Sequence, residues 1–164
     1  MFYVQERVGK GGRRFRLYKF RSMRKGAEDR TGPVLSSRHD PRVTGVGRVL
    51  RATAIDELPQ LWNILRGDMS VVGPRAERPE FVEEFKRSIP GYDLRHRVPP
   101  GLTGPAQVFG HYETPPEEKL RWDLDYIRHW TFWGDLRLIV RSFLLTFTAR
   151  WQERESHFRG DVSA

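Results

Sequence analysis

The chain has 164 residues, no cysteine and a formal net charge of +8 at pH 7, and 38% of its residues are hydrophobic and 30% charged. This length gives one domain with a core rather than two ordinary domains, and the composition excludes a disordered chain. The lack of cysteine excludes disulfides and thiolate metal sites. The positive charge indicates an anionic partner: nucleic acid, a phosphate-bearing small molecule or an anionic membrane surface.

The N-terminal third predicts a β-hairpin followed by a polar loop. Residues 2–7 and 14–22 have strand character and flank the glycine-rich turn at residues 9–12. Because the strand pattern already begins at Phe2, directly after Met1, we expect the chain to be a piece of a longer protein. No apolar run reaches the roughly 18–20 residues that span a bilayer, and no signal peptide is visible. Residues 24–41 are predicted to form the polar loop.

The middle of the chain predicts two short helices and an extended piece. The first helix covers residues 42–52, and the second follows Asp56, a favourable N-cap residue, and ends at Gly67. The second helix is amphipathic because four apolar residues recur at helical spacing: Leu58, Leu61, Trp62 and Leu65. Residues 69–72 are expected to be extended.

The last part predicts three helices and one loop. Pro79 opens a helix, residues 98–105 form a loop, and Thr114 with Glu117 forms a capping box for the next helix. The final helix runs from about residue 135 to 150, with an apolar face that suits either a core or a membrane interface. That face holds Leu136, Ile139, Val140, Phe143 and Phe147. The predicted fold is α/β (α+β), a mostly helical single domain over residues 1–150 with a small hairpin, followed by a charged tail at 151–164.

Asp56 and Glu57 are the strongest candidate for chemistry. Carboxylates in a first helical turn are common, because the helix dipole stabilises an anion there by roughly 0.3–1 kcal/mol. Here, however, glycine-containing turns flank the pair, and five arginines lie nearby in sequence: Arg48, Arg51, Arg66, Arg75 and Arg78. Arginine forks bind phosphate oxygens, and a carboxylate holds a hard divalent cation against them. The pattern suits a diphosphate site, and a surface ion-pair network is the alternative.

Other candidate chemistries have little support in the sequence. The five histidines lack the spacing of zinc ligands. Ser70 has no nucleophile-elbow context, and Gly45 with Gly47 forms only a fragment of a dinucleotide fingerprint. On the hairpin alone, Lys19 and Arg21 are ordinary basic residues that share one face with Phe15 and Leu17.

Several motifs together resemble the bacterial sugar transferase family, whose members are monotopic polyprenyl-phosphate phosphoglycosyl transferases. The matching segments follow the family's order and cover nearly everything from Phe2 to Arg150. They are YKFRSM (18–23), DPRVT (40–44), IDELPQLWN (55–63), RGDMSVVGPR (66–75), ERP (77–79), PGLTG (100–104) with AQV (106–108), and KLRWDLDYI (119–127).

The resemblance implies transfer of a sugar-1-phosphate from a UDP-sugar to undecaprenyl phosphate, with release of UMP. Asp56 would be the nucleophile that forms a covalent aspartyl phosphosugar and a ligand of Mg²⁺, and Glu57 would position the metal or the nucleophile. Five further positions match active-site motifs and are implied to bind substrate: Lys19, Arg75, Arg78, Gln107 and Asp123. The implied setting is the cytoplasmic face of the bacterial inner membrane, with amphipathic helices on its surface, at the start of exopolysaccharide, capsule or other glycan assembly.

The chain departs from the family's pattern at four points. The family's N-terminal membrane-re-entrant helix is absent, Pro99 replaces a basic residue, Pro105 replaces an aromatic residue or leucine, and Ala76 replaces proline. Because Pro99 and Pro105 depart from the family's pattern, one alternative is a family member that binds UDP-sugar but does not turn it over. A non-catalytic module for anionic surfaces or nucleic acid is the other alternative, although no nucleic-acid motif is present. The apolar last helix would also favour self-association into a homo-oligomer.

Overall fold

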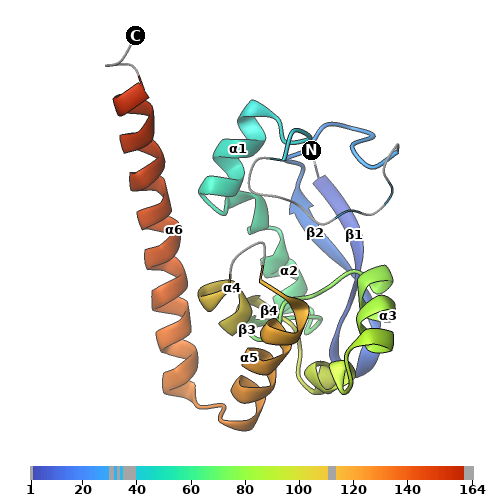
Figure 1. Ribbon diagram of the computed structural model, residues 1–164. Coiled ribbons are helices and arrows are strands. Elements are labelled where there is room, and N and C mark those ends of the chain that lie inside the picture. The colour runs from blue at the N-terminus through green and yellow to red at the C-terminus, as the bar shows by residue number, and fades with distance from the viewer. Residues whose placement is uncertain (1, 30–31, 33, 35–39, 111–113, 161–164) are drawn as a thin grey trace.

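The computed structural model describes residues 2–29, 32, 34, 40–110 and 114–160, with side chains as far as Thr146. It is a mixed α/β domain, mostly helical, with one antiparallel and one parallel pair of strands. Figure 1 shows the hairpin on one side of the molecule and the long C-terminal helix on the other. The predicted fold class is therefore confirmed.

The N-terminal hairpin has the predicted form. Strand β1 (Phe2–Val8) pairs with β2 (Arg14–Phe20), and the 3₁₀ turn η1 (Lys10–Gly12) connects them. Gly11 and Gly12 have φ values of 65° and 77°, which glycine adopts at little cost. Alternation in β2 buries Leu17 and exposes Arg14 and Arg16.

The segment around the acidic pair differs in detail from the prediction. Helix α1 (Gly45–Ala52) starts at Thr44, whose Oγ1 accepts a hydrogen bond from the Gly47 N–H at 3.0 Å. A 3₁₀ turn, η2 (Ile55–Glu57), precedes helix α2 (Gln60–Leu65). Asp56 thus lies inside η2, and the prediction that it caps the following helix is wrong.

Helix α2 is amphipathic, but its apolar side faces away from the protein. Gln60 and Asn63 are its buried residues. The four apolar residues of the predicted stripe are exposed, with relative exposures of 52% for Leu58, 48% for Leu61, 57% for Trp62 and 80% for Leu65.

The predicted loop at residues 98–105 contains a strand. Strand β4 (Gly101–Thr103) pairs in parallel with β3 (Ser70–Val72). The prediction of an uninterrupted loop is therefore wrong. Helix α4 (Pro105–Phe109) follows directly and has Pro105 at its start, where a missing N–H costs nothing.

Four elements complete the chain: α3 (Pro79–Ser88), η3 (Tyr92–Arg97), α5 (Pro116–Arg128) and α6 (Phe132–Gly160). Helix α5 has Pro115 at its N-cap position, so the predicted N-cap at Thr114 is wrong by one residue. Helix α6 is longer than predicted at both ends and continues past residue 150. The side chain of Phe147 lies outside the described residues.

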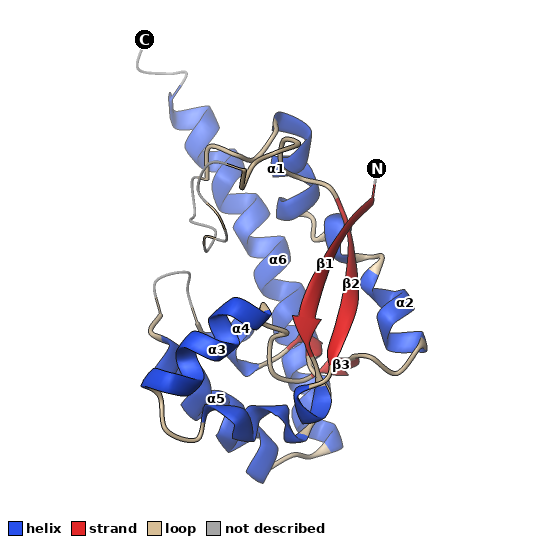
Figure 2. Cartoon of the chain, turned by 90° about the vertical axis from the view of Figure 1, so that its right-hand side faces the viewer, coloured by secondary structure: helices blue, strands red, loops and turns tan. Residues whose placement is uncertain are grey.

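Three small clusters form the core and join elements distant in sequence. The largest cluster links the hairpin to α3, η3 and α5 through Val8, Val82, Ile89, Tyr92 and Leu120. The second joins Leu17, Met69 and Ala76, and the third joins Val72, Val108 and Leu138 of α6. Figure 2 shows α6 passing behind the hairpin and extending beyond it. Among the described residues, no helix is both long and apolar enough to cross a bilayer.

Candidate active site

The acidic pair is presented by an unusual turn. Ala54 adopts a left-handed conformation (φ 53°, ψ 15°) between α1 and η2, and it is the one non-glycine residue with positive φ in the described part of the chain. Such conformations disfavour side chains with a Cβ and often occur at functional sites. In this turn Asp56 is 6% exposed and Glu57 is partly buried.

Lys19 connects the hairpin to this turn. Its Nζ lies 2.5 Å from Oε1 of Glu57, and the two side chains are 19% and 27% exposed. The pair is 38 residues apart in sequence, so the fold, rather than local spacing, brings these groups together. A partly buried ion pair with this geometry restricts both side chains.

The two carboxylates have opposite electrostatic environments. Burial raises the pKa of Asp56 above its ordinary value, the Lys19 charge works against this rise, and the neighbouring Glu57 charge adds to it. Burial also acts to raise the pKa of Glu57, but the positive charges of Lys19 and Arg75 outweigh it and hold that pKa below its usual range. These surroundings therefore favour the ionised form of Glu57, whereas burial disfavours the ionised form of Asp56.

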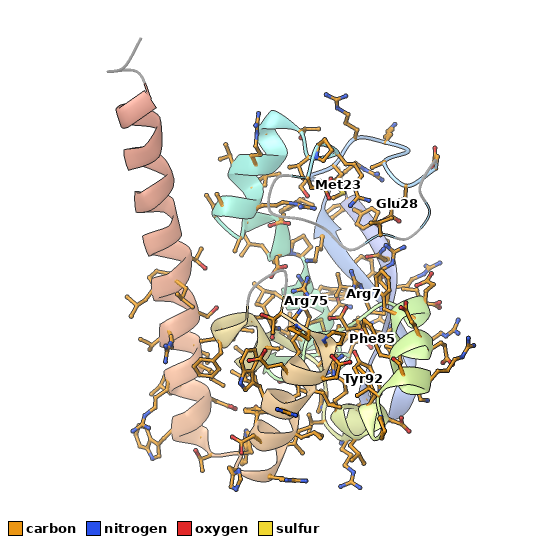
Figure 3. The ribbon with its side chains drawn as sticks, viewed as in Figure 1. Arg7, Met23, Glu28, Arg75, Phe85 and Tyr92 are labelled. Atoms are coloured by element: carbon orange, nitrogen blue, oxygen red, sulfur yellow. The ribbon has the colours of Figure 1, made fainter. Side chains whose placement is uncertain are left out.

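A small, open pocket lies beside this ion pair. Its polar wall consists of Arg7, Lys19, Glu57, Gln60 and Arg75, and its other lining residues are Leu17, Met69, Ala76, Gly101 and Leu102. Three cations face one carboxylate, so the pocket favours an anion. Figure 3 shows Arg7 and Arg75 close together near the centre of the molecule.

The strand pair β3–β4 holds the loop that carries Arg75. A Cβ on Gly101 would lie 2.1 Å from the Gly73 nitrogen, and one on Gly104 would lie 2.0 Å from the Gly73 oxygen. The glycines therefore permit a close backbone approach that a side chain would prevent. Arg75 itself forms a parallel bridge with Gly101, which places its backbone at the end of the strand pair.

Three predicted binding residues lie outside the pocket lining. Arg78 donates to both carboxylate oxygens of Glu28, at 2.7 and 3.0 Å. Asp123 is fully buried and accepts from Arg95. Gln107 lies in α4, where its side-chain amide atoms are buried and have no hydrogen-bond partner among the described residues. Direct substrate binding by these three residues stays a prediction.

Sequence reasoning missed three residues of this region: Arg7, Gln60 and Arg95. Gln60 follows Glu57 by three residues, a spacing that a helical reading could have placed beside the carboxylate pair. Arg7 and Arg95 lack such a local signal, because long-range packing brings them close to the loop that carries Arg75. Arg7 donates to the Ala76 carbonyl oxygen at 3.0 Å, and Arg95 donates to the Arg75 carbonyl oxygen at 3.0 Å.

The carboxylates offer limited means of holding a metal. Within the described residues, no group of three or more histidine, aspartate or glutamate side chains is placed to hold an ion. Magnesium, however, is commonly held by one or two carboxylates together with substrate phosphates. Glu57 is already paired with Lys19, so Asp56 is the carboxylate that fits this mode of binding.

Comparison with known proteins agrees with this arrangement of motifs. The family description "Bacterial sugar transferase" matches residues 1–149. The chain therefore belongs to the bacterial sugar transferase family.

Curated relatives of this chain are named as undecaprenyl-phosphate transferases. This chain is 44% identical over 156 residues to the UDP-N-acetylgalactosamine-undecaprenyl-phosphate N-acetylgalactosaminephosphotransferase of Aeromonas hydrophila. The match covers 92% of this chain and 37% of the relative. This chain is 45% identical over 145 residues to the UDP-glucose:undecaprenyl-phosphate glucose-1-phosphate transferase of Caulobacter vibrioides, covering 85% of this chain and 54% of the relative. The chain thus spans between about a third and a half of these relatives.

Proposed function

We propose that this domain transfers a sugar-1-phosphate from a UDP-sugar to undecaprenyl phosphate and releases UMP. The observation that carries the proposal is the buried Asp56 next to Glu57, because Glu57 and its ion-pair partner Lys19 line a pocket together with Arg7 and Arg75. Asp56 itself is not one of the lining residues of this pocket. The names of the relatives support the classes of donor and acceptor.

In the first step, a carboxylate oxygen of Asp56 attacks the sugar-bearing β-phosphorus of the donor. An aspartyl–phosphorus bond forms while the bond from that phosphorus to the bridging oxygen breaks, and UMP leaves with the electron pair. A carboxylate and a diphosphate repel each other, so nearby cations are needed to bring them together. Lys19 and Arg75 provide positive charge on the donor side of the pocket.

In the second step, a phosphate oxygen of undecaprenyl phosphate attacks the same phosphorus. The aspartyl–phosphorus bond breaks, Asp56 regains its carboxylate, and the product is an undecaprenyl diphosphate sugar. Dividing one displacement between two easier steps is the general benefit of covalent catalysis.

Asp56 would hold Mg²⁺ together with the phosphates of the donor, since Glu57 is occupied by Lys19. When bound, the ion would offset the negative charge of the diphosphate. Among this chain's own residues, Glu57 holds Lys19 in place, and Lys19 in turn favours the ionised form of Asp56.

The proposal places the domain on the cytoplasmic face of the bacterial inner membrane, where it would begin the assembly of an exopolysaccharide, capsule or other glycan. Large apolar side chains on α1, α2 and the start of α6 support contact with a lipid surface. These include Val46, Val49, Leu61, Trp62, Leu65, Phe132 and Trp133, each at least 48% exposed.

The test is intact-protein mass spectrometry after incubation with Mg²⁺ and each of several UDP-sugars, with the Asp56→Asn variant alongside. The first step needs no lipid acceptor, so we expect a sugar-phosphate adduct on the native chain and none on Asp56→Asn. Asp93→Asn, which alters an exposed carboxylate on η3, is the matched control and should still form the adduct.

Two results would contradict the proposal in different ways. An adduct that persists in Asp56→Asn would exclude Asp56 as the nucleophile. UDP-sugar binding without an adduct or UMP release would instead favour the non-catalytic relative suggested by Pro99 and Pro105. The identity of the sugar that forms the adduct would also name the donor.

A further inference from the structure

A single buried arginine joins three parts of the fold next to the pocket. Arg95 of η3 is 4% exposed, and its Nε and Nη2 lie 3.0 and 2.7 Å from Oδ2 of Asp123 on α5. Its Nη1 donates to the hydroxyl oxygen of Tyr92 at 2.7 Å. Its Nη2 also donates to the main-chain carbonyl oxygen of Arg75 at 3.0 Å. The guanidinium therefore links α5 to the loop between β3 and α3.

The surroundings of this arginine keep it charged and immobile. Asp123 has no exposed surface, and Tyr92 is 3% exposed and packs against Phe85 with ring centroids 5.3 Å apart (Figure 3). Burial acts to lower the pKa of Arg95, but the charge of Asp123 outweighs it and raises that pKa. All three nitrogens of the guanidinium make hydrogen bonds, which restrict its geometry because a displacement would leave buried donors or acceptors unpaired.

What this arginine holds is the backbone of a pocket residue. The Arg75 carbonyl oxygen accepts from Arg95, while the Arg75 side chain lines the pocket with Lys19 and Glu57. On the other side, the Arg75 backbone bridges to Gly101. Two contacts from different elements thus fix the point from which this side chain extends into the pocket.

We propose that Arg95 is a positioning residue for Arg75, and that Asp123 and Tyr92 act by holding Arg95. The inference rests on the proposed function, in which Arg75 faces the anionic part of the donor. It gives Asp123 an indirect role: this carboxylate orients Arg95 and does not need to touch the substrate. Arg75 has 47% of its side chain exposed, so neighbouring side chains restrict its direction only in part and the backbone anchor matters more.

The test uses a variant that removes the buried ion pair while keeping its volume apolar, Arg95→Met with Asp123→Leu. Replacing both charges leaves no uncompensated ion, and such replacements are often neutral for stability. We expect a folded protein with a somewhat lower melting temperature, because the Tyr92 hydroxyl and the Arg75 carbonyl oxygen lose their partner. Its Kd for UDP, measured by calorimetry with Mg²⁺, should be weakened about tenfold. Arg75→Met should weaken UDP binding by a similar factor.

Combining Arg75→Met with the double variant shows whether Arg95 acts through Arg75 or affects UDP binding independently. Because Arg95 acts through Arg75, adding Arg75→Met to the double variant should weaken binding little further, which is the non-additivity expected of coupled residues. A matched control is Arg42→Met with Asp40→Leu, another largely buried arginine–aspartate pair, which lies just before α1, and the Kd of this variant should be unchanged.

Each other outcome has a definite meaning. A folded Arg95→Met, Asp123→Leu variant with native UDP affinity overturns the positioning role, provided Arg75→Met is weakened. Native affinity in Arg75→Met removes Arg75 from the site and contradicts the binding residue assumed under the proposed function. If the double variant does not fold, Arg95→Lys decides: it keeps the charge but lacks the planar fork, and unchanged affinity in it overturns the proposal.

Discussion

In the proposed mechanism Asp56 must be ionised to attack phosphorus, and its burial opposes that ionisation. Burial raises its pKa, while Lys19 and Arg51 work in the other direction and Glu57 adds to the rise. A nucleophilic carboxylate with a raised pKa is more basic than an exposed one and binds phosphorus more readily once ionised. Lys19 therefore has two effects, since it fixes Glu57 and also keeps Asp56 available.

Replacing Lys19 with methionine should move the pH dependence of the first step. A carboxylate reacts only above its pKa, so the rate of adduct formation is lost as pH falls through the pKa of Asp56. Removing the Lys19 charge raises that pKa further, so the acid limb should shift to higher pH. Single-turnover rates at saturating donor between pH 4.5 and 8 measure this shift. Lys10→Met, on the exposed hairpin turn, is the control, and an acid limb that coincides in Lys19→Met and native protein would contradict the argument.

Ala54 provides a second prediction, on stability. A left-handed conformation costs an alanine roughly 1–2 kcal/mol, and glycine avoids this cost but gains freedom in the unfolded chain. Ala54→Gly should therefore raise the free energy of unfolding by about 0.5–1 kcal/mol. The same change at Ala52, within α1, should lower it by about 1 kcal/mol. Urea denaturation measures both, and destabilisation by Ala54→Gly would show that the turn is not strained.

At the scale of elements, α2 is attached to the hairpin through a side-chain amide. Asn63 is fully buried, and its Oδ1 accepts from the Tyr18 N–H at 3.1 Å. Its Nδ2 donates to the Arg16 carbonyl oxygen at 2.7 Å and to Asp68 at 3.2 Å. The amide thus extends the pairing of β2 at its free edge, and it fixes the helix that follows the acidic pair.

Asn63→Leu keeps the volume but removes these hydrogen bonds, leaving the backbone groups of Arg16 and Tyr18 buried and unpaired. Each such group costs about 1–3 kcal/mol, so we expect the free energy of unfolding to fall by about 2–4 kcal/mol. The reverse change on the exposed side, Leu61→Asn, should alter it by less than about 0.5 kcal/mol. Equal stability of Asn63→Leu and native protein in urea would show that the amide does not anchor α2.

This helix also illustrates what the sequence could and could not predict. Periodicity correctly predicted that Leu58, Leu61 and Leu65 share one face. It could not predict whether the rest of the domain covers that face or the opposite one. The strand at Gly101–Thr103 was missed because three residues are too few for a local pattern, and its pairing with Ser70–Val72 depends on distant residues. The hairpin was predicted well because both its strands and its glycine turn are adjacent in sequence.

The same distinction applies to the candidate site. The segment containing Asp56 and Glu57 was found because its motif is contiguous. The contact of Glu57 with Lys19 spans 38 residues, and that of Arg95 with Asp123 spans 28, so only the folded chain shows which charges meet.

For the molecule as a whole, exposed apolar side chains and a net charge of +8 occur together. Two α6 residues, Phe132 and Trp133, are 66% and 69% exposed, and Leu65 of α2 is 80% exposed. A cationic protein with exposed aromatic residues gains from both apolar burial and attraction to anionic lipid at a membrane surface. Such a surface would also bring the domain to the plane where a polyprenyl phosphate acceptor resides.

We therefore expect the protein to bind vesicles containing phosphatidylglycerol more tightly than vesicles of phosphatidylcholine alone, and to lose part of this preference as salt increases. Cosedimentation measures the binding. Trp133→Glu should weaken it, because the change removes apolar area and adds repulsion from the anionic surface. Glu118→Gln, on an exposed residue of α5, should not weaken it. If Trp133→Glu and the native protein sediment equally with anionic vesicles, the start of α6 does not contact the lipid. The next residues to replace would then be the exposed apolar residues of α1 and α2.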